Sequence, residues 1–241
     1  MERRTFLKTS ALAGLAGVSQ SNADLHAETD SKDKNATRTL TERLNPKIQR
    51  AREVALSMLK PSPRDLERGL RLHSESLVFD AYAFSPRAAI DGEALAKAVE
   101  AGASEIEIKD LREEMAMTRY ATDSAEQQEY LDAWRASGVT CIFQNAGEEG
   151  QDPMRLIKRL ARFTFATDIL RDFVSKAAVP EDIVEAKRKG QHCLYLTGNG
   201  VPLTQQWETT TDEMKYMRIF FQLGIRMMHM TYNRRNMLGD G

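Results

Sequence analysis

The stretch that decides the fold is Gln191 to Gly241, and it starts with the apolar run His192-Cys193-Leu194-Tyr195-Leu196-Thr197. Gly198-Asn199-Gly200 follows and predicts a turn, because glycine adopts positive φ readily. A helical pattern comes next and closes at Gly224, where a helix C-cap glycine belongs. A second apolar run, Ile225 to Met230, leads into a polar loop. Strand, helix and strand at this spacing predict a βαβ unit, whose parallel strands place both polar loops at one edge of the sheet.

The segments before this unit continue the alternation of strands and helices. Two further strands are predicted over Leu77–Ala81 and Gly138–Phe143. Helical character is predicted over Pro46–Leu59, Arg64–His73, Asp91–Ala101, Asp110–Ala136, Pro153–Ala177 and Pro180–Lys189. The predicted fold class is α/β, a TIM-like (β/α) barrel of which about four βα units, the first half, are present. Because such a barrel closes with eight strands in about 250 residues, we expect the sequence to end before the fold does.

Composition excludes several classes of protein. Hydrophobic residues make up 41% of the 241 residues and charged residues 29%, which is typical of a globular protein and not of a disordered one. The net charge is −1, and lysine and arginine are spread along the chain. A nucleic-acid partner is therefore not expected. Nothing in the pattern indicates a particular oligomeric state.

The N-terminus carries a targeting pattern. Arg3-Arg4-Thr5-Phe6-Leu7-Lys8 matches the twin-arginine signal, and Ser21-Asn22-Ala23 offers small residues for cleavage. The run Thr9–Val18 between them is too short and too weakly apolar to span a membrane, so no transmembrane segment is expected. We interpret residues 1–26 as a signal peptide for export to the periplasm or beyond, residues 27–60 as a tether and entry helix, and residues 61–241 as the half-barrel. A basic N-terminus that arose by chance is the alternative.

The two cysteines, Cys141 and Cys193, both fall within predicted strands. One interpretation is a pair of small buried side chains. The other is a disulfide between neighbouring strands, which an exported protein could form. Their spacing and neighbours do not indicate a cysteine metal site.

The segment from Leu223 to Gly241 resembles a known family. Its sequence, LGIRMMHMTYNRRNMLGDG, is similar to the L-G-x-R-x-x-x-L-T-x-N-x-x-N segment of the membrane (renal) dipeptidases. The resemblance extends back to about Ser76. It implies a TIM-like barrel, two zinc ions as cofactors and a dipeptide or small-molecule substrate.

The resemblance also implies where metal ligands would lie, and this chain departs from the family there. The family's first strand ends in D-G-H-x-D, and here the aligned residues run from Asp80 to Phe84, with Tyr82 at the histidine and Phe84 at the aspartate. The family's bridging glutamate aligns with Asn199, which can also be interpreted simply as part of a Gly-Asn-Gly turn. A phenol, a phenyl ring and an amide do not replace imidazole and carboxylate ligands of zinc. We therefore expect no intact metal site in this chain.

Two residues near the C-terminus complete the candidate site. Tyr232 aligns with a family histidine that contacts substrate, and its hydroxyl can still donate a hydrogen bond. His229 is predicted to be a buried, hydrogen-bonded core histidine within the last strand. His73 and His192 have no partner at ligand spacing and are given no role.

Three functions remain open from the sequence. The first is a zinc dipeptidase of which this is the N-terminal half, truncated and inactive as given. The second is an exported, non-catalytic relative of the barrel that binds a peptide or small molecule. The third is an exported interaction scaffold.

Overall fold

The computed structural model describes residues 45–148, 153–199, 209–233, 235, 239 and 240, which all belong to one compact unit, Leu44–Gly241. Its helices are α2 Pro46–Leu59, α3 Pro63–Glu75, α4 Gly92–Glu100, α5 Glu105–Thr122, α6 Ser124–Ser137, α7 Pro153–Ile169, α8 Pro180–Arg188 and α9 Thr210–Gln222. Its strands are β1 Phe79–Ala83, β2 Cys141–Glu148, β3 Val174–Ala177, β4 His192–Asn199 and β5 Met227–Met228. The predicted signal peptide and most of the tether lie outside the described residues.

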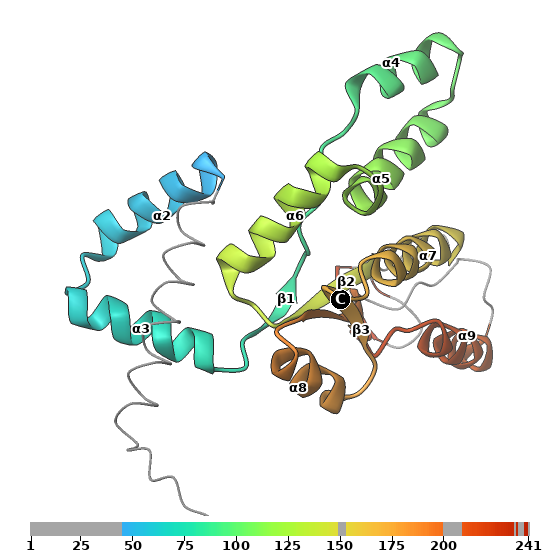
Figure 1. Cartoon of the computed structure of the whole chain (residues 1–241). Helices are drawn as coiled ribbons and strands as arrows, with labels where there is room; N and C mark the ends of the chain where they lie inside the picture. The colour runs from blue at the N-terminus through green and yellow to red at the C-terminus, as the bar shows by residue number, and fades with distance from the viewer. Residues whose placement is uncertain (1–44, 149–152, 200–208, 234, 236–238, 241) are drawn as a thin grey trace, which may run out of the picture. The chain divides into compact units, whose positions relative to one another are not determined.

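The strands form one parallel sheet in the order β1-β2-β4-β3 (Figure 1), and β5 also pairs with β4. β2 runs along one side of β4. On the other side, β3 pairs with β4 from His192 to Tyr195, and β5 pairs with Thr197 and Gly198. Among the described residues the sheet is open, since no pairing joins β1 to β3 or β5. The α/β class is thus confirmed, and closure into a barrel stays a prediction.

One strand was missed by the sequence patterns. Pro153–Ala177 was predicted to be helical throughout, but α7 ends at Ile169 and β3 begins at Val174. Leu170 and Phe173 continue the apolar spacing of the helix, so periodicity could not show the break. In the structure the turn is closed by the Phe173 N–H, which donates to the Leu170 carbonyl at 2.8 Å. Burial of Val174 against the sheet then favours the extended conformation.

A helix predicted as continuous over Asp110–Ala136 is in fact two helices. Asp123 has an extended backbone and separates α5 from α6. Its carboxylate accepts hydrogen bonds from the backbone N–H groups of Ala125 and Glu126, so it caps the start of α6. The break lets the two helices pack side by side on the sheet.

The main core lies between the sheet and α5, α6 and α7, which Figure 1 shows above the strands. Trp134 of α6 is 1% exposed and packs with Tyr130 and the ring of His192. Ile142 of β2 and Leu194 and Leu196 of β4 form the floor of this core.

The opposite face of the sheet carries a smaller core beside α8. Cys141 and Cys193 pair in register across β2 and β4 and are fully buried, together with Ala177 and Ala186. Both cysteines are free thiols, so the interpretation as small buried side chains is confirmed. The hydrogen bond with the Cys141 thiol, and then burial, raise the pKa of Cys193.

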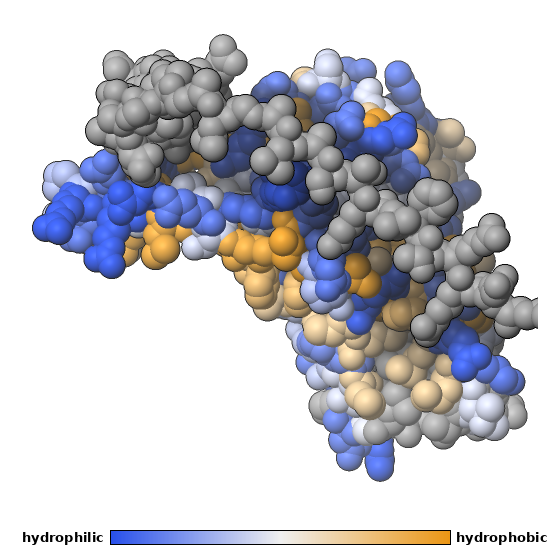
Figure 2. All heavy atoms as spheres, turned by 60° about the horizontal axis from the view of Figure 1, so that its bottom comes forward, coloured by the Kyte–Doolittle hydropathy of each residue, from blue (hydrophilic) through white to orange (hydrophobic). Residues whose placement is uncertain are grey.

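Hydrophobic side chains also reach the surface. Figure 2 shows such residues (orange) beside hydrophilic ones on one face of the molecule. In the described part of the chain, no helix is both long enough and apolar enough to cross a membrane.

Candidate functional site

Parallel pairing brings the ends of four strands to one side of the sheet, which we call the carboxyl edge. It comprises the segments that end or directly follow β1, β2, β4 and β5: residues 82–85, 144–148, 197–199 and 229–232. All the positions implied by the resemblance, Tyr82, Phe84, Asn199 and Tyr232, fall within it. Parallel α/β sheets commonly bind their ligands at this side.

Three rings meet at the carboxyl edge and form what we call the aromatic cluster: Tyr82, Phe84 and His229. The rings of Tyr82 and Phe84 meet edge to face with centroids 6.3 Å apart, and the imidazole of His229 lies parallel to the Tyr82 ring at 6.4 Å. The guanidinium of Arg87 stands 5.7 Å from the centroid of Phe84. Tyr82 is 45% exposed and Phe84 51%, so about half of each side chain is accessible to solvent.

The position of His229 differs from the sequence prediction. It was expected in the core of the last strand, but β5 spans just Met227 and Met228, and His229 is half-buried directly after it. Its backbone N–H donates to the carbonyl of Gly198 at 3.1 Å, which anchors the residue to the end of β4. Tyr232 lies three residues further on and is exposed. Asn199, the last residue of β4, pairs in register with Glu148.

Backbone hydrogen bonds fix the chain that carries Tyr82 and Phe84. The carboxylate of Asp80 accepts from the Tyr82 N–H at 3.1 Å, and the Ser85 N–H donates to the side-chain oxygen of Gln144 at 2.6 Å. Gln144 is buried, and its amide nitrogen donates in turn to the Asn145 carbonyl at 2.8 Å. The two rings therefore project from a segment attached to β2.

Gln144 and Asn145 are residues of the edge that sequence analysis gave no role. Both are buried, and the Asn145 carboxamide oxygen accepts from the Gly147 N–H at 3.1 Å. A Cβ at Gly147 would come within 2.7 Å of a terminal methyl group of Leu156, so a larger residue there would displace the Leu156 side chain. Amides that are satisfied in this way hold the C-terminal end of β2 in place. The sequence feature that could have indicated them is a pair of polar residues directly after the apolar run of β2.

A charge network between α5 and α7 contacts the same end of β2. Glu113 accepts hydrogen bonds from Arg155, Arg159 and Arg162, with the shortest at 2.6 Å from Arg159. Arg159 also donates to the carbonyl of Ala146 at 3.5 Å. Burial alone would raise the pKa of Glu113, but the hydrogen bonds from Arg159 and Arg155 outweigh it and lower that pKa to about 2. Glu113 is thus a carboxylate at neutral pH.

This network was also missed by sequence analysis. Its arginines lie on α7 at positions 155, 159 and 162, a helical spacing of four and three residues, and its acids lie on α5. Charged residues at such spacing ordinarily face solvent. A sequence pattern does not show that two charged faces meet each other, and here the helix packing decides it.

The other two histidines discussed above serve the fold. The His192 ring hydrogen-bonds the Val139 carbonyl at 2.6 Å and packs against Trp134, and burial lowers its pKa. His73 lies against Gly138, where a Cβ would come within 2.6 Å of the imidazole. Neither histidine is part of the carboxyl edge.

The described residues of the carboxyl edge do not fit a pair of zinc ions. In the described part of the chain no three His, Cys, Asp or Glu residues stand together as metal ligands. Tyr82 and Phe84 occupy the two positions that the resemblance aligns with zinc ligands, and their rings meet edge to face. The phenyl ring has no donor atom for a metal.

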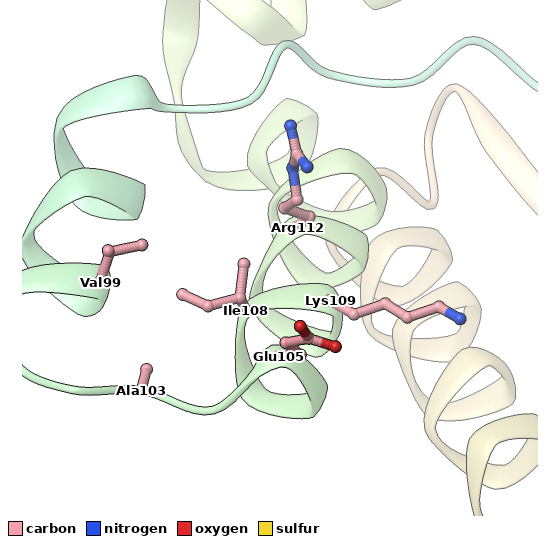
Figure 3. Close-up of a pocket in the computed structure, with 6 residues that line it drawn as sticks. All are labelled: Val99, Ala103, Glu105, Ile108, Lys109 and Arg112. Carbon is pink, nitrogen blue, oxygen red and sulfur yellow. The ribbon is translucent and has the colours of Figure 1, made fainter.

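A separate hollow of about 380 Å³ lies between α4 and α5 (Figure 3) and is lined by Val99, Ala103, Glu105, Ile108, Lys109 and Arg112. It takes no residue from the carboxyl edge. Its lining combines an apolar floor with long charged side chains, an arrangement typical of a groove between two surface helices.

The fold and the edge define an α/β protein with an open parallel sheet and an aromatic site at the ends of its strands. No family model matches the chain, and no curated protein matches it. A solved structure of an amidohydrolase from Pseudomonas aeruginosa is similar at 18% identity and a TM-score of 0.43. The match covers 71% of this chain and 39% of that one.

Proposed function

We propose that this protein binds a short peptide or small organic molecule with an aromatic group at its carboxyl edge, and that it does not hydrolyse dipeptides through a zinc pair. The observation that carries this proposal is the aromatic cluster of Tyr82, Phe84 and His229. The resemblance aligns two of these residues, Tyr82 and Phe84, with positions where the membrane dipeptidases hold metal ligands. The twin-arginine pattern adds that this binding takes place after export.

The cluster has the chemistry for such a ligand. Ring faces that are half exposed lose water-accessible apolar area when another ring packs on them, which is favourable. Arg87, close to Phe84, adds a positive charge that attracts a carboxylate, the group at one end of every peptide. Aromatic group and carboxylate together match a dipeptide with an aromatic C-terminal residue.

The binding prediction compares two dipeptides, glycyl-phenylalanine and glycyl-alanine. We expect the first to raise the melting temperature of the protein and the second to leave it unchanged. Replacing Tyr82 or Phe84 with alanine should weaken the binding of glycyl-phenylalanine about tenfold, because each removes one ring contact. Isothermal titration calorimetry measures the affinity. Phe165→Ala is the matched control, since Phe165 of α7 is also about half exposed but lies outside the edge. Equal binding of both dipeptides would contradict the proposal, and no binding by either would favour an interaction scaffold.

A second prediction concerns zinc. The unaltered chain should retain less than one equivalent of zinc after dialysis and should not cleave dipeptides. Substituting Tyr82→His, Phe84→Asp and Asn199→Glu together should raise zinc retention, because imidazole and carboxylates then replace groups that bind the ion poorly. Elemental analysis measures both. The control changes the same three residues to alanine and should gain no zinc. Two tightly held zinc ions in the unaltered chain would refute the assignment of these positions.

A further inference from the structure

Helix α2 turns its apolar stripe outward. Ile48, Ala51, Val54, Ala55 and Met58 follow the spacing of one helix face, and Leu59 extends it; Ile48 is half-buried and the others are exposed. Val54 is 50% exposed, Met58 77% and Leu59 76%, and α2 has no buried residue. An amphipathic helix normally packs such a stripe against other parts of the protein. In the described part of the chain, most of this stripe is instead exposed to solvent.

The charges of α2 are arranged around the stripe. At 100° per residue, Arg50 and Arg52 lie on either side of Ala51, one at each border of the apolar face. Lys47 stands at the start of the helix, Lys60 directly follows it, and Glu53 lies on the opposite face. The stripe is therefore bordered by positive charge, and the single acid of the helix points away from it.

The neighbouring helix α3 serves as an internal comparison. Its stripe of Leu66 and His73 is bordered by Asp65 and Glu67, and His73 packs against Gly138 of the α6–β2 turn. Like α2, α3 has no buried residue and its Leu70 is 43% exposed, so the two helices differ in the charges that border their stripes. The basic border is specific to the outward stripe of α2.

We propose that α2 is a surface anchor that lies on an anionic lipid membrane. Apolar side chains would enter the boundary of the acyl chains while Arg50 and Arg52 contact lipid phosphates, as in other amphipathic helices with basic borders. The charge pattern argues against a second copy as the occupant, because two α2 helices would bring like charges together. With 14 residues, α2 is too short to span a membrane, so it lies on the surface.

The test is co-sedimentation of the full chain with vesicles of phosphatidylcholine alone or mixed with phosphatidylglycerol. We expect binding to the anionic vesicles alone, weakened by salt. The double variants Val54→Glu/Met58→Glu and Arg50→Gln/Arg52→Gln should each lower the partition coefficient at least about tenfold. Both should keep the melting temperature of the unaltered chain, because α2 buries no side chain. Ile106→Glu, at an exposed apolar position of α5, is the control and should bind as the unaltered chain does.

Three results would overturn the inference. The first is failure to bind anionic vesicles. The second is binding that survives both double variants, which would place the contact elsewhere in the chain. The third is a dimer, seen by light scattering, that Val54→Glu/Met58→Glu dissociates, since the stripe would then be covered by a second copy.

Discussion

Replacing Glu113 with glutamine is expected to lower the free energy of unfolding at pH 7 by about 3 kcal/mol. The amide keeps the shape of the side chain but removes the charge that three arginines of α7 approach. Buried Arg159 would lose the Glu113 carboxylate that it approaches at 2.6 Å, whereas buried Arg162 would keep its ion pairs with Asp110 and Glu114. Urea denaturation followed by circular dichroism measures the change.

The effect of this substitution should depend on pH. The pKa of Glu113 is lowered from 4.5 to about 2 in the folded protein, so its contribution is complete above pH 4.5 and is lost as pH falls toward 2. The stability difference between the unaltered chain and Glu113→Gln should therefore shrink across this window. A difference that stays constant down to pH 2 would show that it does not come from the charge.

Glu185 provides the matched control for Glu113. Its pKa is also lowered to about 2, by hydrogen bonds from Arg188 and Lys189, but its side chain is 43% exposed, whereas that of Glu113 is 10% exposed. Solvent screens exposed ion pairs, so Glu185→Gln should leave the stability unchanged within error. If Glu185→Gln lowered the free energy of unfolding as much as Glu113→Gln does, the stabilising effect of the Glu113 network would not depend on its burial.

The second large effect is expected for Trp134→Ala, which should lower the free energy of unfolding by about 3–5 kcal/mol. Trp134 fills the space between α6 and the sheet, and its removal leaves a cavity among Tyr130, Phe173 and His192. Denaturant unfolding measures the loss. Neighbouring rings would lose their packing partner, so near-ultraviolet circular dichroism should also weaken.

Trp134→Phe distinguishes packing from hydrogen bonding at this site. Among the described residues, the indole N–H of Trp134 has no hydrogen-bond partner. Phenylalanine removes that unpaired group and keeps most of the ring contacts, so we expect a loss well below that of the alanine variant. Equal losses in the two variants would show that the indole N–H is paired in solution.

Local patterns in the sequence were sufficient for most helices and for four of the five strands in the described residues. Pro180 and the acids after it predicted the start of α8, and the apolar run from His192 predicted β4. These features depend on neighbouring residues, which the sequence presents directly. β3 was not predicted. It has just four residues, and the residues before it continue the apolar spacing of a helix, so no local pattern indicated a strand.

The sequence predicted which residues lie at the candidate site, but it did not predict how their side chains contact one another. The resemblance placed Tyr82, Phe84, Asn199 and Tyr232 near strand ends, and parallel pairing confirmed that these positions share one edge. The stacking of His229 on Tyr82 was not foreseen, because residues 147 positions apart meet there through two different strands.

The sequence by itself determined the α/β class, the parallel direction of the strands and the identity of the residues at their ends, since spacing and turn chemistry are local properties of the chain. The tertiary structure alone decided which charged faces became buried, which stripe remained outward and which rings met. Glu113 and Arg159 look like surface residues in the sequence, yet they are paired in the interior. Met58 looks like a core residue and is exposed. Burial depends on what packs against a face, and that partner lies far away along the chain.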